Sequence, residues 1–243
     1  MLSIAGFDPS GGAGVLADVK TFEANDVLGF AINTSITVQN ESEFSKIYWL
    51  PIEQIKEQLE ILFKIYEINF VKIGLVKNFE MLNAICDELL RLNNKIKIIW
   101  DPILKSSSGF LFHQNFNESD LKNLLQKIYL ITPNTDEAKI LFSTDNAEMI
   151  ISKGFTTTTN ILLKGGHKNT NDANDVLISK TSYQTIESDR IKNAAKHGSG
   201  CVLSASIVAN LANNKGITKA CVDAKKYIST YLISSENLLG FHH

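Results

Sequence analysis

The chain has 243 residues, of which 44% are hydrophobic and 21% are charged, and its formal net charge at pH 7 is -2. This balance allows a buried core and excludes a chain that is disordered throughout. The lack of a long basic stripe gives no indication of a nucleic-acid partner, and the apolar runs are too short to span a bilayer, so no membrane insertion is expected. Three widely spaced cysteines predict neither a disulfide framework nor a zinc site. The first residues lack a signal-peptide pattern, so we expect a cytoplasmic protein.

The first half of the chain alternates short apolar segments, typical of strands, with longer segments of helical periodicity. The expected strands cover residues 2–5, 30–38, 70–73 and 96–100, and the expected helices cover 15–25, 51–66 and 79–92. The last of these strands is almost wholly apolar, which is typical of a strand buried on both faces of a parallel sheet.

The second half continues the same alternation. The expected strands cover 129–132, 161–164 and 176–179, and the expected helices cover 201–212 and 218–234. Alternating strands and helices predict a parallel sheet covered by helices on both faces. No linker rich in Pro, Gly or Ser divides the chain, so we expect one domain over residues 1–243. In such sheets ligands bind beyond the carboxyl ends of the strands, which makes the residues directly after strands the candidate site.

A glycine-rich loop over residues 6–14 follows the first strand and opens the first helix. Its glycines allow close backbone approach to a ligand, and the helix N-terminus offers free amide donors to an anion. It is not a Walker loop, because Gly12 stands where the lysine must be. Residues 12–17 fit the dinucleotide pattern G-x-G-x-x-A, but the pattern starts late and the second strand ends in Gln39 and Asn40, with no acidic residue to hold a ribose. A tight turn without a ligand is the remaining alternative.

A second glycine loop precedes a helix of small and apolar residues and reads His197, Gly198, Ser199, Gly200 and Cys201. Several backbone N–H groups aimed at one point would stabilise the charge on a transferring phosphoryl group. Cys201 lies at the helix N-terminus, where the dipole is expected to lower the pKa of the thiol, so that a thiolate could accept a proton from an attacking hydroxyl. A buried structural thiol is the alternative, and a cysteine hydrolase with a histidine base is another.

Polar residues follow the middle strands. Asp101 comes directly after a buried strand, and Asn134 and Glu137 follow the next strand, where Asn134 can cap the following helix. Asp101 and Glu137 could hold Mg²⁺, directly or through waters, beside phosphate oxygens. Alternatively, Glu137 offsets a helix dipole and Asp101 is a turn residue before a proline. Lys164 ends a later strand and could pair with phosphate, and Gly165 permits close backbone approach.

The motifs, in chain order, are SIAGFDPSGGAG, VQN, KIGLV, DPILKSSSG, TPNTDEA, LLKGGH and HGSGCVLSA. This ordered set spans almost the whole chain and resembles the hydroxymethylpyrimidine/phosphomethylpyrimidine kinases of thiamine biosynthesis. The resemblance implies an α/β fold, a ribokinase-like three-layer α/β/α sandwich with a central, mostly parallel sheet. It also implies transfer from ATP, with Mg²⁺, to the hydroxymethyl group of 4-amino-5-hydroxymethyl-2-methylpyrimidine and then to its monophosphate. It favours a homodimer.

The resemblance assigns one group of residues to the pyrimidine. Gln39 would hydrogen-bond the aminopyrimidine ring with its side-chain amide, which is both donor and acceptor. Cys201 would lie near the hydroxymethyl group and serve as the base. The pocket would be shaped by Gly6 and Ala13, with Leu75 and Ile103 as apolar walls.

A second group is assigned to the phosphates and the nucleotide. The loop of Gly198, Ser199 and Gly200 would bind the transferring phosphate, and Asp101 with Glu137 would organise Mg²⁺. The nucleotide side would be contacted by Asn134, Glu137, Lys164, Gly165 and His197.

The chain departs from the family pattern at four places. Phe7 stands where Ser or Thr is usual, and Ser199 replaces a threonine with another hydroxyl. Ser107 stands where the family has a lysine, and Ala195 with Lys196 stands where it has Asn-Thr, so phosphate contacts from these two places are not expected. Two alternatives follow for function, a pyridoxal/pyridoxine kinase of the same fold and a non-catalytic pyrimidine-binding sensor.

Overall fold

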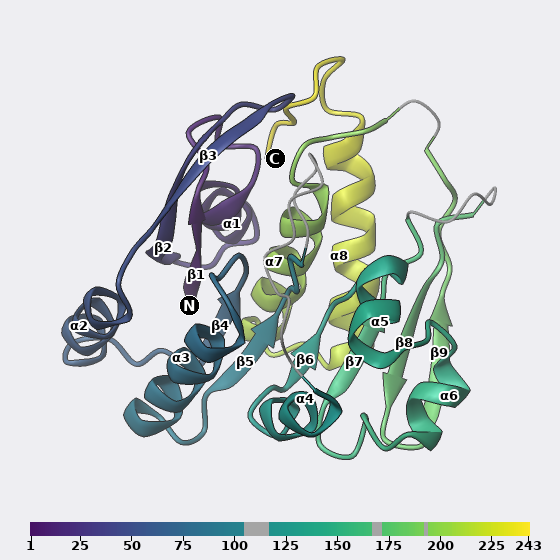
Figure 1. Ribbon diagram of the computed structural model, residues 1–243. Coiled ribbons are helices and arrows are strands. Elements are labelled where there is room, and N and C mark those ends of the chain that lie inside the picture. The colour runs from purple at the N-terminus through teal and green to yellow at the C-terminus, as the bar shows by residue number, and fades with distance from the viewer. Residues whose placement is uncertain (105–116, 167–171, 192–193) are drawn as a thin grey trace.

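The computed structural model describes residues 1–104, 117–166, 172–191 and 194–243, and Ser107 lies outside the described residues. Strands in the described part form one sheet (Figure 1). Their bounds are β1 Leu2–Phe7, β2 Phe30–Gln39, β3 Phe44–Trp49, β4 Phe70–Ile73, β5 Lys97–Trp100, β6 Leu130–Ile131, β7 Asn160–Leu163, β8 Asp175–Ser179 and β9 Ser182–Ile186.

The strand order across the sheet is β3-β2-β1-β4-β5-β6-β7-β8-β9. The six strands from β2 to β7 in this order are mutually parallel. The strands at the two ends are antiparallel to their inner neighbours, namely β3 to β2, β8 to β7 and β9 to β8. The sheet is therefore mostly parallel, and its parallel strands deliver their carboxyl ends to one edge.

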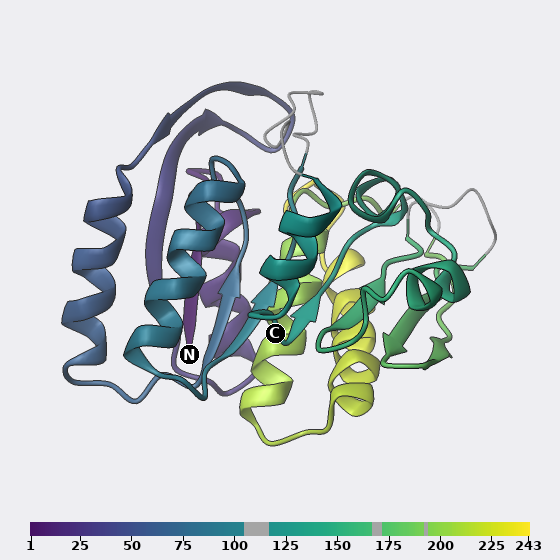
Figure 2. The ribbon, with the colours of Figure 1, turned by 60° about the horizontal axis from the view of Figure 1, so that its bottom comes forward.

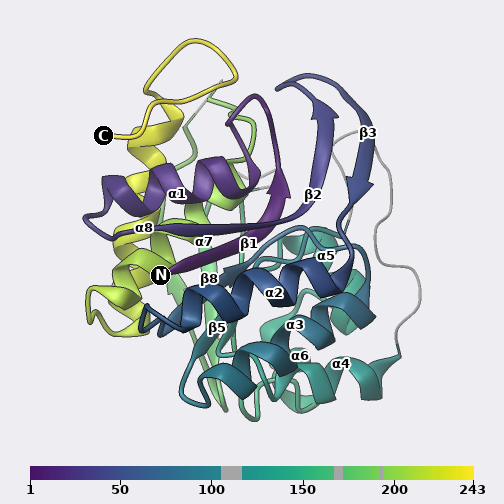
Figure 3. The same ribbon diagram turned by 90° about the vertical axis from the view of Figure 1, so that its left-hand side faces the viewer.

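Helices cover both faces of the sheet and make a three-layer sandwich (Figures 2 and 3). Their bounds are α1 Gly14–Ala24, α2 Ile52–Phe63, α3 Phe79–Leu92, α4 Glu118–Leu125, α5 Thr135–Phe142, α6 Ala147–Ser152, α7 Ser199–Ala212 and α8 Ile217–Leu232. One apolar core joins α2 to α6 to the sheet, and a second joins α1, α7 and α8 to the opposite face. Burial of these two apolar layers on either side of the sheet is the main stabilising contribution to the fold.

The expected α/β class and the three-layer, mostly parallel architecture are confirmed. The strand expected at 70–73 and the helix expected at 79–92 have the predicted bounds, and the other expected elements differ from the observed ones by one to three residues at their ends. The sequence did not predict β3, β9, α4 or α6. No helix in the described residues is long and apolar enough to cross a membrane.

The turn after β1 brings the start of α1 back against the strand. The register of β1 against β2 shifts between Ala5 and Gly6, and Gly14 has a φ of +61°, a left-handed conformation that favours glycine. A Cβ added at Gly14 would lie 2.1 Å from the carbonyl oxygen of Gly6. Only glycine therefore allows α1 to begin so close to the end of β1, which places the first glycine loop at the carboxyl edge of the sheet.

Candidate active site

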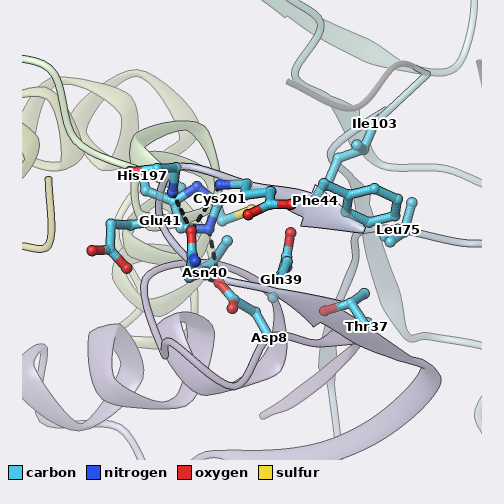
Figure 4. A pocket seen from close by; sticks show the side chains of 16 residues that line it. Asp8, Thr37, Gln39, Asn40, Glu41, Phe44, Leu75, Ile103, His197 and Cys201 are labelled. Atoms are coloured by element: carbon cyan, nitrogen blue, oxygen red, sulfur yellow. Dashed lines mark hydrogen bonds and ion pairs between the residues drawn. The ribbon is translucent and has the colours of Figure 1, made fainter. Parts of the chain in front are cut away.

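Two cavities open at the carboxyl edge of the sheet and share one wall. The smaller cavity, of about 350 Å³, lies between the ends of β1 and β2 and the start of α7 (Figure 4). The larger cavity, of about 670 Å³, lies beside it, over the residues that follow β5, β6 and β7. The lining residues common to both are Ile103, His197, Gly198 and Cys201. A ligand in one cavity would therefore meet a ligand in the other at the N-terminus of α7.

The smaller cavity brings together the residues predicted for the pyrimidine. In addition to the shared residues it is lined by Gly6, Ala13, Gln39 and Leu75. Figure 4 shows Leu75 and Ile103 at one end, His197 and Cys201 at the other, and Gln39 between them. Sequence reasoning missed several further lining residues, among them Asp8 and Phe44.

The larger cavity brings together most of the residues predicted for phosphates and nucleotide. Its lining includes Asp101, Asn134, Glu137, Lys164, Ser199 and Gly200. Gly165 is the exception, because its backbone N–H donates to Asp175 Oδ1 at 2.8 Å inside the protein, and Gly166 lines the cavity in its place. Of the two glycines after Lys164, Gly166 therefore faces the cavity, and a nucleotide contact of Gly165 stays a prediction.

Asp8 organises the first glycine loop. Its side chain is buried and accepts hydrogen bonds from the backbone N–H groups of Ser10 at 2.9 Å and Ala13 at 3.0 Å, and from the Ser10 hydroxyl. His197 of the second loop donates from Nε2 to Asp8 Oδ2 at 2.8 Å. Burial alone would raise the pKa of Asp8, but the hydrogen bonds from His197 and Ser10 hold it below its usual range. Asp8 is thus an ionised residue that joins the two loops.

The second glycine loop begins α7 directly over the sheet. Gly198 is the N-cap, with a φ of +71°, and a Cβ there would lie 2.0 Å from the carbonyl oxygen of Gly12. The first N–H groups of a helix have no partner within the helix, so the start of α7 presents donors and a positive dipole end to the shared wall. A Cβ at Gly200 would lie 3.5 Å from Lys164 Nζ, which places an ammonium group beside these donors.

Asp101 and Lys164 form a buried ion pair beneath the larger cavity. Lys164 Nζ lies 2.7 Å from Asp101 Oδ1, and the carboxylate also accepts from Thr132 Oγ1 at 2.9 Å and Ser204 Oγ at 3.0 Å. Burial alone would lower the pKa of Lys164, but the carboxylates of Asp101 and Glu137 raise it. Both groups are therefore charged. Oδ1 of Asp101 accepts from two donors, whereas Oδ2 has the Ser204 hydroxyl as its partner, and this hydroxyl also lies 3.0 Å from the carbonyl oxygens of Gly200 and Cys201.

Asn134 caps α5, as predicted, and Glu137 completes a capping box with it at the start of the helix. Asn134 Oδ1 accepts from the Glu137 N–H at 2.9 Å, and the Asn134 N–H donates to Glu137 Oε2 at 2.8 Å. Burial raises the pKa of Glu137 to about 7, against the effect of Lys164. One carboxylate oxygen is used by the cap, and the side chain lines the larger cavity together with Asp101 and Lys164.

The thiol of Cys201 does not have the low pKa predicted from its place at a helix N-terminus. Burial raises its pKa to about 11, and the positive charge of Lys72 does not offset this effect. The prediction of a thiolate was wrong because the dipole effect is small, whereas removal of a thiolate from water is costly. Cys201 is a neutral thiol at pH 7.

A second buried ion pair lies on the α1 and α7 side of the sheet. Lys72 in β4 contacts Asp18 in α1, and neither side chain is exposed to solvent. Ser3 in β1 donates from Oγ to Asp18 Oδ2 at 2.6 Å. Burial alone would lower the pKa of Lys72, but the carboxylate of Asp18 raises it. Sequence reasoning missed this pair, although a lysine inside an otherwise apolar strand is a signal that a buried partner exists.

Comparison with known proteins identifies the family to which these features belong. The family profile described as phosphomethylpyrimidine kinase matches residues 8–242. A hydroxymethylpyrimidine/phosphomethylpyrimidine kinase from Aquifex aeolicus (strain VF5) is 35% identical over 98% of this chain and 95% of the relative. A protein of the same name from Staphylococcus aureus (strain MRSA252) is 35% identical over 94% of this chain and 86% of the relative.

The solved structures that are similar to this one include proteins named for two different kinase activities. The phosphomethylpyrimidine kinase from Clostridium difficile 630 has a TM-score of 0.76 and 32% identity, and the match covers 94% of this chain and 96% of that chain. The Bacillus subtilis pyridoxal kinase in its ADP complex has a TM-score of 0.84 and 25% identity, and the match covers 99% of this chain and 96% of that chain. The fold is shared by both activities, so the choice between them depends on the sequence relationship and on the site.

Proposed function

Because the chain belongs to the phosphomethylpyrimidine kinase family, we propose that its two joined cavities carry out transfer of the γ-phosphoryl group of ATP to the hydroxymethyl group of 4-amino-5-hydroxymethyl-2-methylpyrimidine and then to its monophosphate. The observation that carries the proposal is the shared wall, where His197, Gly198 and Cys201 line both cavities. An acceptor in the smaller cavity and a nucleotide in the larger one would meet there, with the reacting atoms beside the start of α7.

The acceptor is proposed to lie in the smaller cavity. The Gln39 amide, between the apolar and polar ends of the cavity, can donate to and accept from an aminopyrimidine edge. Leu75 and Ile103 supply apolar contact at one end. The thiol of Cys201 is neutral, so it is proposed to contact the hydroxymethyl group as a positioning group and not to remove its proton.

The transferring phosphoryl group is proposed to lie against the second glycine loop. The backbone N–H of Gly200 lies in the first turn of α7 and is preorganised by the helix, so it requires no reorganisation when charge develops, whereas the Ser199 N–H donates to Lys196 O at 3.3 Å. Lys164 Nζ lies close to Gly200 and is held by Asp101. In phosphoryl transfer, where positioning and electrostatic stabilisation account for most of the catalysis, Lys164 would contact the phosphate oxygens as they develop charge.

Mg²⁺ is proposed to bind beside Glu137, where it would neutralise phosphate charge. The residues fit the ion in part: Glu137 is a partly buried carboxylate whose pKa is raised by burial to about 7, and a hard cation beside it would favour the charged form. Asp101 is proposed to hold the ion through water: its Oδ1 accepts from Lys164 and Thr132, and its Oδ2 faces the Ser204 hydroxyl. No group of three or more acidic, His or Cys side chains in the described part could hold a metal alone, so phosphate oxygens and water would complete the shell.

The proposal is tested by coupled ADP release with Mg²⁺-ATP and three acceptors: the pyrimidine, its monophosphate and pyridoxal. We expect turnover of both pyrimidines and much slower turnover of pyridoxal. Preference for pyridoxal would overturn it in favour of the activity named for the Bacillus subtilis neighbour. Tight pyrimidine binding without ADP release would favour the sensor. A homodimer and a cytoplasmic location remain predictions, of which light scattering in solution tests the first.

A further inference from the structure

We propose that the hydrogen bond between Asp8 and His197 is a positioning device that fixes the two glycine loops against each other, so that the acceptor and the transferring phosphoryl group are held in line. The inference rests on the proposed function, because that function assigns the first loop to the acceptor and the second to the phosphate. Both residues also line the acceptor cavity, and the role proposed here is the contact that they make with each other. Each acts through the loop that it holds.

The contact joins parts of the chain that are far apart in sequence. Asp8 follows β1, and His197 lies 189 residues later, immediately before the N-cap of α7. The Asp8 side chain is 2% exposed and that of His197 is 14% exposed. A charge-assisted hydrogen bond shielded from water in this way is stronger than an exposed one, so the pair can restrain two loops that lack regular structure.

Both ends of this hydrogen bond are themselves fixed. Asp8 is held by the Ser10 and Ala13 N–H groups, which belong to the first loop. The backbone N–H of His197 donates to the Leu238 carbonyl oxygen at 2.9 Å, which ties the second loop to the C-terminal segment. A displacement of either loop would therefore break Asp8–His197 before it broke the local contacts.

The backbones of the two loops are also in contact at the same place. Added Cβ atoms show how little room remains: one at Gly198 would lie 2.0 Å from Gly12 O and 2.8 Å from Ala13, and one at Gly12 would lie 2.8 Å from the His197 ring. These contacts prevent the loops from moving closer but provide no directional attraction. The hydrogen bond supplies that attraction and fixes the separation.

The distance between the two loops matters because of the geometry that phosphoryl transfer requires. Gly6 and Ala13, in the first glycine loop, line the smaller cavity. Ser199 and Gly200, in the second glycine loop, line the larger cavity. Phosphoryl transfer requires the attacking oxygen, phosphorus and leaving oxygen to be nearly in line. A misplacement of about 1 Å can lower a rate by about 100-fold without a comparable loss of binding.

The test compares His197→Met with His197→Gln. The Gln side-chain amide nitrogen can reach the position of Nε2 and donate to Asp8, whereas Met has similar length and no donor. We expect Met to lower kcat by about 100-fold, with the KM values for the pyrimidine and ATP changed by less than about threefold, and Gln to recover most of the loss. His243→Met, a substitution at an exposed histidine, is the matched control and should behave as wild type.

Four outcomes decide the inference. A kcat loss in Met that Gln reverses supports it. Met with wild-type kcat, Met and Gln equally impaired, or a raised pyrimidine KM at unchanged kcat would each overturn it. Wild-type turnover in the same assay tests the proposed function separately, because a wild-type protein without turnover fails before any variant is compared.

A second variant covers the case in which His197→Met does not fold. Asp8→Asn keeps the shape of the side chain but places an amide donor where the carboxylate accepted. We expect the same loss of kcat from Asp8→Asn and from His197→Ala, which has no donor, and no further loss when the two are combined, because both changes remove one contact. Fully additive losses would overturn the inference.

Discussion

Among the buried lysine–aspartate pairs of the described residues, which also include Lys225 with Asp175, two have clearly different surroundings. Lys72 and Asp18 are completely enclosed between β4 and α1. Lys164 and Asp101 line the larger cavity, with side chains that are 10% and 3% exposed. The first pair cannot reach a ligand, whereas the second lies beside the start of α7. A buried lysine–aspartate pair can therefore contribute to stability where it is fully enclosed, and to function where it borders a cavity that can hold a ligand.

The difference extends to what each carboxylate holds. Asp18 accepts from Lys72 and from Ser3 of β1, so it ties α1 to two strands. Asp101 accepts from Lys164, Thr132 and Ser204, which belong to the end of β7, the end of β6 and α7. Asp101 therefore fixes the position of a cation at the cavity, which suits a positioning role better than direct metal binding.

The largest expected effect is on stability, from Lys72→Met. Removal of the ammonium would leave Asp18 buried without its cation, and breaking a buried ion pair in this way costs about 3–5 kcal/mol of the free energy of unfolding. Denaturant unfolding measures the loss, and kcat of the folded protein should stay within about threefold of wild type. The double variant with Asp18→Leu should regain most of the stability, since it leaves no unpaired charge. A loss below about 1 kcal/mol in the single variant would show that the pair is not a stabilising contact.

The next effect is on catalysis, from Lys164→Met. Loss of one preorganised cationic donor at the phosphate is expected to lower kcat by about 100- to 1000-fold, while Asp101 keeps its hydrogen bonds from Thr132 and Ser204. Steady-state kinetics and denaturant unfolding should be measured on the same samples. Lys219→Met, at an exposed ion pair on α8, is the control. If Lys164→Met lowered the stability and left kcat unchanged, the assignment of a functional role to the Lys164–Asp101 pair would be wrong.

A smaller loss of kcat is expected from Cys201→Ser. Removal of a general base usually lowers a rate by about 100- to 10,000-fold, but the Cys201 thiol, with its pKa raised to about 11, is neutral from pH 6 to 9. We therefore expect a loss of less than about 100-fold and the same dependence of kcat on pH in both proteins over that range. A loss of three orders of magnitude, with a changed pH profile, would restore the base role.

The sequence predicted the elements whose pattern is strong and local. The helix α3 has a clear apolar face, and β4 is a short apolar run between helices, so their bounds were predicted correctly. The strand β3 was missed because FSKIYW carries a lysine and a serine at an edge with several exposed side chains. The short helix α4 was missed because its sequence, ESDLKNLL, is mostly polar. Edge strands and short helices depend on tertiary contacts that no local pattern records.

The same limit applies to the site. Position after a strand correctly predicted that Asp101, Glu137 and Lys164 line one cavity, because parallel strands end at one edge. The contact between Asp8 and His197 could not be predicted, since it depends on the distance between two loops in the folded chain. The predicted direction of the Cys201 pKa shift was wrong for a similar reason. The sequence shows that the residue lies at a helix terminus, but it does not show how deeply the thiol is buried.

The smallest expected effect is a pH dependence of stability at Glu137, beside the Lys164 pair. The folded pKa of about 7 is above the ordinary value of 4.5, so the folded state binds the proton more tightly than the unfolded chain does. The contribution is therefore fully present below pH 4.5 and is lost as pH rises through 7. In metal-free buffer, Glu137→Gln should keep the capping box and show a smaller fall in unfolding temperature between pH 5 and pH 8 than wild type. Lys164→Met should steepen the fall, because Lys164 lowers this pKa, whereas Lys72→Met should leave it unchanged. An equal slope in all four proteins would mean that Glu137 does not sense the pair at the cavity.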